Sequence, residues 1–426
     1  MIGGCGATAR APARHASSAP PPAPATSTTT ARPAPHAPPP GPGQVALDRS
    51  LTAPLHTAGP NTGAVVYDIT AHKLLFAYKQ DVKRPPASVE KLYTTVAVLT
   101  DIGPSARIHT TVLATGHLAG GVWHGNLYLR GGGDPTLGDG AFNRVWEQGQ
   151  GPTGSDLVHQ LQTQRLSSVT GWVIGDPSLF DDMLGGPNSH GAPDINDMGG
   201  ELSALTYDHG ATIGKLSPSA FAAKELALTM GGAHVKAKAA PFTAKTPPGA
   251  HTLATVTSPP MSVVLKLMDV PSDDFFAEML TKLLGAHYGT GGTTKEGAEV
   301  VASAAAEFGV HPNIVDGSGL SRADLSSPLE VVDLLRSVYA TPTGKTLRDS
   351  LPVLGVNGTT RRIGVKTAAQ GHCVGKTGTL DYVTNLAGYC QAHDGHTLAF
   401  AIFLDGPSNE SSIQLLTRMV GPIARY

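Results

Sequence analysis

The alternation of hydrophobic and polar residues changes twice along the chain and predicts three regions. "TGAVVYDITAHKLLFAYKQD", residues 62–81, alternates well enough for two strands joined by a turn near Ala71 and His72. A helix is then predicted from near Ser88 to "DIGPS", which ends at residue 105. The first region is therefore expected to run strand, strand, helix.

Residues 106–250 show a different pattern, in which short apolar runs alternate with glycine turns. Examples are "GVWHGNLYLRGGGDPTL", "VTGWVIGDPSLFDD" and "ELALTMGGAHVKAKAAPF". Short apolar runs between glycine turns are typical of strands. We therefore expect a β-rich insertion in this part of the chain.

Helical periodicity returns after the insertion. "DDFFAEMLTKLLGAHYG" carries an apolar helix face, with Ser272 at the expected N-cap. The residues of this face are Phe275, Phe276, Met279, Leu280, Leu283 and Leu284. A further helix is predicted in "SSPLEVVDLLRSVYA", and the C-terminal region from residue 372 predicts three antiparallel strands and a closing helix. These predictions indicate an α+β fold.

Composition favours a globular enzyme and argues against nucleic-acid binding. The 426 residues are enough for two or three lobes, and 40% of them are hydrophobic, which argues against general disorder. Lys and Arg number 31 against 33 Asp and Glu, and no long basic run could neutralise a phosphate backbone. No apolar stretch approaches the roughly 20 residues that span a bilayer.

The N-terminal residues suggest an extracytoplasmic location. "IGGC" is similar to the cleavage box of a bacterial lipoprotein, with Cys5 as the lipidated residue, although Cys5 could equally be one thiol in a floppy terminus. The Pro/Ala/Thr-rich stretch that follows, up to residue 44, is typical of a tether. Cys373 and Cys390 flank a predicted hairpin, and the sequence leaves open whether they form a disulfide or remain free thiols.

Ser88 and Lys91 form the first candidate for chemistry. Residues three apart on a helix share a face, so a proton could pass between the two side chains. A plain capping box would place Glu or Gln at position 91, whereas a lysine there opposes the helix dipole. Ser88 is thus either a helix cap or a nucleophile with Lys91 as its base, and this motif alone does not decide between them.

"GKTGT", residues 375–379, is the second candidate and must first be tested as a phosphate-binding loop. That motif requires glycine at position 370, which is Gln370, and a helix after Thr379, which the sequence does not predict. The alternative is a strand on which Lys376 offers a charge to a carboxylate and Gly378 allows close approach of a ligand. The third candidate, Ser272 to Asp274 in "PSDDFFAE", would alone be an ordinary helix start.

Taken together, the three motifs resemble those of the penicillin-recognising serine enzymes, which are Ser-x-x-Lys, Ser-x-Asn and Lys-Thr-Gly. More closely, the chain resembles the D-alanyl-D-alanine carboxypeptidase/endopeptidase family, the low-molecular-mass class C penicillin-binding proteins. The resemblance spans most of residues 45–426 and includes "PASVEKLYTT", "LYLRGGGDPTL", "SDDFFAEML", "VDGSGLSR", "LPVLGVNGTTRR" and "GKTGTL". That family also carries a large β-rich insertion between its first and second motifs.

The resemblance implies a penicillin-binding transpeptidase-like domain and a domain division. The catalytic domain would comprise residues 45–105 and 251–426, with an antiparallel sheet flanked by helices. Residues 106–250 would be inserted in it, and residues 1–44 would be a leader remnant and tether. The substrates would be peptidoglycan stem peptides, and β-lactams would bind the same site. No metal or cofactor is implied.

The resemblance also assigns roles to individual residues. Ser88 would attack the D-alanyl-D-alanine carbonyl while Lys91 takes its proton, and Ser272 would relay a proton to the leaving amine. Lys376, with Thr377 and Gly378, would bind the terminal carboxylate. The backbone N–H groups of Ser88 and Thr379 would form the oxyanion hole.

Two further residues are candidates for binding the peptide stem. Arg322 would bind a charged group of the stem, or else pair with a nearby aspartate. Asp181, in the insertion, is a candidate for the same pocket, against the alternative of a solvated loop residue.

Asp274 departs from the family pattern, which has asparagine at this position. An ionised carboxylate only accepts hydrogen bonds, and near Lys91 and Lys376 it would stabilise their protonated forms. Activity could be reduced or shifted in pH or substrate, or Asp274 could be held protonated or paired with Lys376. The leading hypothesis is an extracytoplasmic serine DD-peptidase. The alternatives are a β-lactamase or esterase of the same superfamily, and a cell-wall binding protein without turnover.

Overall fold

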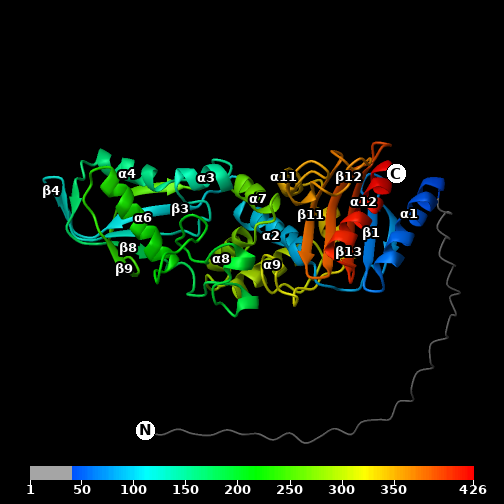
Figure 1. Cartoon of the computed structure of the whole chain (residues 1–426), viewed down its shortest axis with the longest axis horizontal. Helices are drawn as coiled ribbons and strands as arrows, with labels where there is room; N and C mark the ends of the chain where they lie inside the picture. The colour runs from blue at the N-terminus through cyan, green and yellow to red at the C-terminus, as the bar shows by residue number, and fades with distance from the viewer. Residues whose placement is uncertain (1–40) are drawn as a thin grey trace, which may run out of the picture. The chain divides into compact units, whose positions relative to one another are not determined.

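The computed structural model describes residues 41–426, which form one compact unit (Figure 1). The predicted lipidation of Cys5 and residues 1–40 of the predicted tether lie outside the described residues. The prediction that the tether extends to residue 44 is wrong, because a helix begins at Pro42. Within 41–426, no helix is both long enough and apolar enough to cross a bilayer. Helices, antiparallel strands and a smaller number of parallel strands make up this unit, so the predicted α+β class is confirmed.

The first sheet joins the two ends of the described chain. It is antiparallel throughout, in the order β11-β12-β13-β1-β2. The strands are β1 Gly63–Asp68, β2 Lys73–Tyr78, β11 Cys373–Leu380, β12 Val383–Gln391 and β13 Thr397–Asp405. The predicted N-terminal strand pair and the three C-terminal strands are therefore confirmed.

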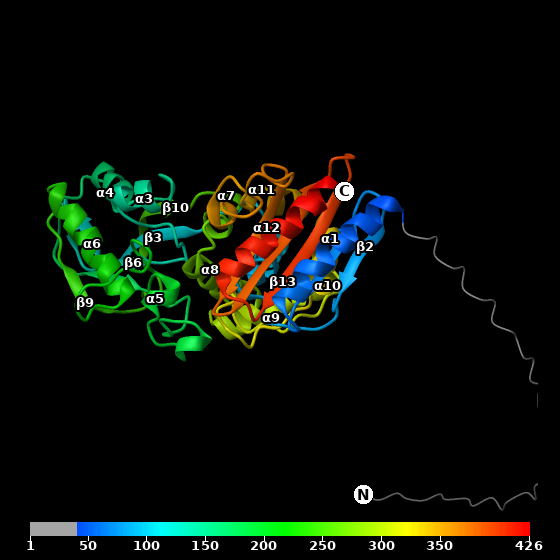
Figure 2. The ribbon, with the colours of Figure 1, turned by 45° about the vertical axis from the view of Figure 1, so that its right-hand side comes forward.

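Helices cover both faces of this sheet, which explains why β12 and β13 are buried almost along their whole length. On one face lie α1 Pro42–Ala58 and the predicted closing helix, α12 Asn409–Arg425 (Figure 2). The sequence did not predict α1, whose leucines pack against the sheet and α12. On the other face lies α10 Pro328–Val338, which begins with the capping box Ser327/Glu330.

A layer of helices continues the core on the α10 side. It comprises α2 Lys91–Ala97, α7 Met261–Asp269, α8 Asp274–Tyr288, α9 Thr294–Glu307 and α11 Pro342–Ser350. The predicted apolar face of α8 is confirmed, because all six of its residues are at most 3% exposed. The predicted N-cap is wrong. Asp273 caps α8 by accepting a hydrogen bond from Phe276 N at 2.9 Å, whereas Ser272 lies one residue earlier in the left-handed region, with φ 66°.

The inserted part contains two sheets. The larger one has the order β10-β3-β6-β8-β9, and the smaller one β4-β5-β7. Its strands are β3 His109–Ala114, β4 His117–Ala119, β5 Val122–His124, β6 Leu127–Arg130, β7 Ser168–Val169, β8 Val173–Asp176, β9 Ala239–Thr243 and β10 His251–Thr257. Because β10 pairs with β3, we propose that the insertion extends to residue 257.

Helices also pack in the inserted part, which is less purely β than predicted. They are α3 Gly140–Trp146, α4 Gly154–Thr163, α5 Ile195–Met198 and α6 Pro218–Gly232. The prediction of a strand in "ELALTMGG" is wrong, because these residues form the second half of α6. Ser217 caps this helix, Pro218 occupies its first turn, and Leu226 and Met230 lie one helical turn apart in the core.

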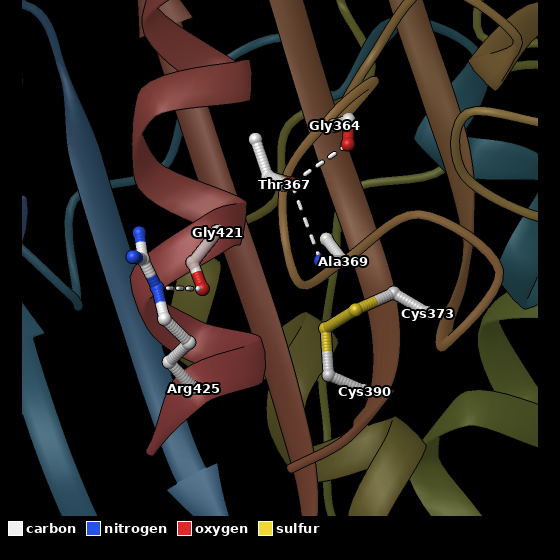
Figure 3. The surroundings of a disulfide bond; sticks show 7 residues. All are labelled: Gly364, Thr367, Ala369, Cys373, Cys390, Gly421 and Arg425. Atoms are coloured by element: carbon white, nitrogen blue, oxygen red, sulfur yellow. Dashed lines mark hydrogen bonds between the residues drawn. A yellow bond between two sulfur atoms is a disulfide. The ribbon is translucent and has the colours of Figure 1, made fainter. Parts of the chain in front are cut away.

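The two cysteines of the C-terminal hairpin form a disulfide (Figure 3). Cys373 on β11 lies directly opposite Cys390 on β12, and both residues are fully buried. The alternative of free thiols is therefore wrong for this structure. The disulfide joins the two strands at the start of β11, three residues before Lys376.

Candidate active site

Ser88 and Lys91 meet at the start of the α2 segment. Residues Ala87–Glu90 form one turn of 3-10 helix that continues into α2, so both side chains project from the same end. Lys91 Nζ lies 3.1 Å from Ser88 Oγ, and Lys91 is fully buried. The Ser88 side chain caps no backbone group, so the interpretation of Ser88 as a helix cap is wrong.

Lys91 uses all three of its N–H groups. Nζ donates to Ser88 Oγ at 3.1 Å, to Asp274 Oδ1 at 2.5 Å and to the carbonyl oxygen of Ser318 at 2.6 Å. This set of partners suits an ammonium ion, which has three donors and no acceptor. A neutral amine in the same place would keep the hydrogen bonds to Asp274 and Ser318 and turn its lone pair toward Ser88. The position of Nζ thus allows hydrogen bonding by a charged or a neutral lysine.

Asp274 is the first residue of α8 and the ion-pair partner of Lys91. Its side chain is 19% exposed, against 0% for Lys91. Burial raises the pKa of the Asp274 carboxyl above its usual value, while the charge of Lys91 and the hydrogen bond from it lower this pKa. The expectation that Asp274 lies beside Lys91 is confirmed. Asp274 forms its hydrogen bond and salt bridge with Lys91 rather than with Lys376.

Lys376 lies on β11 and holds the serine of the second motif. Its Nζ donates to Ser272 Oγ at 2.6 Å and to the carbonyl oxygen of Thr377 at 2.9 Å. Burial and, next, the charge of Lys91 lower the pKa of Lys376 to about 7, although Asp269 and Asp274 oppose this shift. Near neutral pH, Lys376 can therefore either offer a positive charge or exchange a proton with Ser272.

Gly378 lets β11 approach the turn that carries Ser88. A Cβ atom at Gly378 would lie 2.3 Å from Pro86 O and 3.1 Å from Ser88 N, so no side chain fits there. Asn385 on β12 supports the same approach, because its Nδ2 donates to Pro86 O at 3.0 Å. Thr379, the next residue of β11, is exposed beside this junction.

The remaining predicted residues lie at different places. The side chain of Thr377 donates to Thr359 Oγ1 at 2.6 Å. Arg322 is exposed and donates from Nη2 to the carbonyl oxygen of Asp381 at 2.7 Å, in the turn that follows β11. Asp181 is not brought together with the three motifs, because it forms a salt bridge of 2.5 Å with Lys282, a fully buried residue of α8. A role for Asp181 in substrate binding stays a prediction.

Two residues that position Lys91 were not predicted: Ser318, which accepts a hydrogen bond from it, and Glu278, which holds the backbone at Ser318. Ser318 contributes only its backbone carbonyl, which leaves no signature in the sequence. Glu278 on α8 fixes this carbonyl, because its Oε1 accepts from Gly317 N at 3.0 Å and from Ser318 N at 2.9 Å. Burial and the charge of Asp316 raise the pKa of Glu278 to about 7. Glu278 belongs to "SDDFFAE" and Ser318 to "VDGSGLSR", and nothing in the sequence of either segment indicates that the two are in contact.

Ser88 and the buried Lys91 lie at the start of the α2 segment, Ser272 lies just before α8, and Lys376 lies on the edge strand β11. This combination defines the class of penicillin-recognising serine hydrolases. Comparison with known proteins gives the family. The model of the D-Ala-D-Ala carboxypeptidase 3 (S13) family matches residues 44–220 and 198–426. The chain belongs to this family, and it is a hydrolase of the serine DD-peptidase type.

Individual relatives agree with this assignment. The D-alanyl-D-alanine carboxypeptidase of Actinomadura sp. (strain R39) is 28% identical over 86% of this chain and 82% of its own. The crystal structure of penicillin-binding protein 4 from Haemophilus influenzae is similar with a TM-score of 0.73 and 20% identity, over 88% of this chain and 99% of that chain. A predatory peptidoglycan endopeptidase from Bdellovibrio bacteriovorus has a TM-score of 0.54 and 17% identity, over 85% of this chain and 92% of that chain. The two structures show that the fold is shared.

Proposed function

We propose that this protein hydrolyses D-alanyl-D-alanine bonds of peptidoglycan stem peptides through an acyl-enzyme on Ser88, and that β-lactams acylate the same residue. The observation that carries the proposal is the contact between Ser88 Oγ and the buried Nζ of Lys91, 3.1 Å apart. Ser272 and Lys376 are far apart in sequence but hydrogen-bonded to each other, where the start of α8 meets β11. Asp274, two residues after Ser272, connects this pair to Lys91. A helix start with a purely structural role would require none of these contacts.

In the first step, neutral Lys91 takes the proton of Ser88 as Oγ attacks the carbonyl carbon of the penultimate D-alanine. The resulting oxyanion would be stabilised by the backbone N–H groups of Ser88 and Thr379. The absence of a side chain at Gly378 supports this arrangement, because it brings β11 against the Ser88 turn. The tetrahedral intermediate then expels the terminal D-alanine, whose amine must receive a proton.

Ser272 would supply that proton and recover one from Lys376, with which it is hydrogen-bonded at 2.6 Å. A pKa of about 7 lets Lys376 both donate and accept at neutral pH. Charged Lys376, with Thr377, would also attract the terminal carboxylate of the substrate. The proton that Lys91 took from Ser88 would then return through solvent to Lys376, which leaves Lys91 neutral again. Water would attack the Ser88 ester while Lys91 takes a proton from the water and passes it to Ser88 Oγ, and the shortened peptide leaves.

The location and the outer part of the substrate site are further proposals. A disulfide suits an oxidising, extracytoplasmic compartment, where peptidoglycan is found. Lipidation of Cys5 would hold the enzyme at the membrane. Exposed Arg322 lies beside the turn after β11, where it could bind a charged group of the stem.

One observation favours a second candidate, a cell-wall binding protein that does not turn over. The contact between Asp274 and Lys91 stabilises the protonated lysine, which cannot act as a base. Release of D-alanine from a synthetic stem pentapeptide distinguishes the two functions. We expect release by the wild-type protein and none by Ser88→Ala. Equal release by both proteins, or none by either, would contradict the proposed peptidase.

The same assay can separate the remaining possibilities. Release of D-alanine from the pentapeptide measures carboxypeptidase action, and cleavage of a cross-linked peptide dimer measures endopeptidase action. Rapid, repeated hydrolysis of a penicillin without a lasting adduct would instead indicate the β-lactamase alternative.

A further inference from the structure

A histidine of the inserted part contacts the second motif. His209 lies on the segment between α5 and α6, and its side chain is 15% exposed. Its ring centroid lies 4.2 Å from that of Phe275 and 5.9 Å from that of Phe276, both on α8, and 6.5 Å from that of Phe142 on α3. The imidazole is thus held among aromatic rings beside the start of α8.

Both ring nitrogens of His209 face acceptors. Nε2 lies 3.1 and 3.2 Å from the two carboxylate oxygens of Asp273, and Nδ1 lies 3.3 Å from the carbonyl oxygen of Gly199. A neutral imidazole has one N–H and can satisfy only one of these acceptors, whereas the imidazolium ion has two. The arrangement therefore requires the charged form of His209 if both contacts are to be hydrogen bonds.

Asp273 occupies a sensitive position in the second motif. It lies between Ser272 and Asp274, the two residues that contact Lys376 and Lys91. Its carboxylate also caps α8 through Phe276 N. Because Ser272 has φ 66°, an unfavourable conformation for a serine, the position of its Oγ depends on how firmly the following residue is held.

We propose that His209 is a positioning residue for the second motif: as an imidazolium ion it holds the Asp273 carboxylate, and through it fixes Ser272 and Asp274 against the two lysines. The inserted part would thereby influence acylation although it supplies no reacting atom. The inference rests on the proposed function, since it assumes that Ser88 is acylated.

The charges around His209 make the contact dependent on pH. Burial lowers the pKa of His209, but the hydrogen bond and charge of Asp273 outweigh it and raise this pKa above the usual value. Glu147, the C-cap residue of α3, is a further charged group whose charge raises the pKa of His209. Burial and the charge of Asp273 raise the pKa of Glu147 to about 7, although the charge of His209 opposes this increase. The pair is complete while His209 is protonated and weakens as the pH rises through the raised pKa of His209.

The test is a double-mutant cycle on acylation by a fluorescent penicillin. His209→Gln removes the charge, and Asp273→Asn removes the carboxylate but keeps an efficient helix cap. Because hydrogen bonds to charged groups are involved, each single change should slow acylation on the order of tenfold. The double variant should be no slower than the slower single variant. The exposed control His117→Gln, on β4, should acylate at the wild-type rate.

The effect should also depend on pH. The ratio of the wild-type rate to the His209→Gln rate should be largest in acid and fall as the pH rises, because only the wild-type contact depends on this proton. Wild-type rates in both single variants, or effects that simply multiply in the double variant, would overturn the inference, as would a rate ratio that does not change with pH.

A titration of the His209 ring by NMR tests the inference without acylation. In the wild-type protein the midpoint should lie above about 6.5, the ordinary value for histidine, and Asp273→Asn should lower it. An ordinary or lower midpoint, or one that Asp273→Asn leaves unchanged, would refute the imidazolium pair. This titration and Asp273→Asn suffice if His209→Gln does not fold. If the wild-type protein is never acylated, the proposed function fails while the titration still tests the pair.

Discussion

The change Asp274→Asn removes the carboxylate that forms a salt bridge with Lys91. Asp274 Oδ1 lies 2.5 Å from Lys91 Nζ, and Lys91 is shielded from water. The side-chain oxygen of the new amide can still accept a hydrogen bond from Nζ, and its N–H₂ group gains the ability to donate to a substrate carbonyl. The change also restores the residue that the resemblance to the family leads one to expect.

The size of the effect follows from the charge that is lost. A hydrogen bond to a charged group contributes about 1.5 to 3 kcal/mol. The lower end applies here, because Asp274 is partly exposed and burial raises its pKa. If the neutral amine is the reacting form of Lys91, acylation of Ser88 near pH 7 should become about tenfold faster.

The assay is the second-order rate of acylation by a fluorescent penicillin at pH 7, followed by quenching and electrophoresis. Asp349→Asn is the matched control, because Asp349 is a solvent-exposed partner of Lys345 far from the motifs in sequence. Its rate should equal that of the wild-type protein. An equal or slower rate for Asp274→Asn, with folding intact, would show that the site requires the carboxylate and would refute the reasoning.

Other changes test the remaining parts of the site. Gly378→Ala should reduce acylation by about 100-fold, because the added methyl group would displace β11 from Pro86 O, 2.3 Å away; a wild-type rate would contradict this. Since the pKa of Lys376 is about 7, KM for a peptide with a free C-terminal carboxylate should rise as the pH increases above 7, whereas KM for its C-terminal amide should not; parallel pH profiles would show that Lys376 does not bind the carboxylate. Replacing Cys373 and Cys390 together by alanine should lower the free energy of unfolding in urea by about 3 kcal/mol, given the short loop between them; unchanged stability would show that the disulfide contributes little.

The sequence predicted well those elements whose pattern has one meaning. Strands β1, β2, β11, β12 and β13 follow from alternation or from continuous apolar runs, and the apolar face of α8 follows from helical spacing. Helix α6 was not predicted because small residues separate its large apolar ones. The large apolar residues in the segment therefore show no clear helical spacing. Tertiary packing of Leu226 and Met230 decides its conformation.

The candidate site could be predicted as a set of motifs but not as a set of contacts. The spacing of Ser88 and Lys91 predicted their proximity. Gly378 was expected to allow close approach of a ligand, whereas in the structure it allows β11 to approach Pro86 and Ser88. The third partner of Lys91 is a backbone carbonyl, at Ser318, and any residue type could supply it. The contact of His209 with Asp273 joins residues 64 positions apart, and neither local sequence indicates it.

The central claim is that Ser88 is the nucleophile and Lys91 its base. Intact mass measurement after incubation with penicillin tests it most directly. The wild-type protein should gain the mass of one penicillin, peptide mapping should place it on Ser88, and Ser88→Ala should gain none. Lys91→Met, which keeps the length of the side chain without a base, should acylate far more slowly. No adduct on the wild-type protein, or an adduct that persists in Ser88→Ala, would contradict the account.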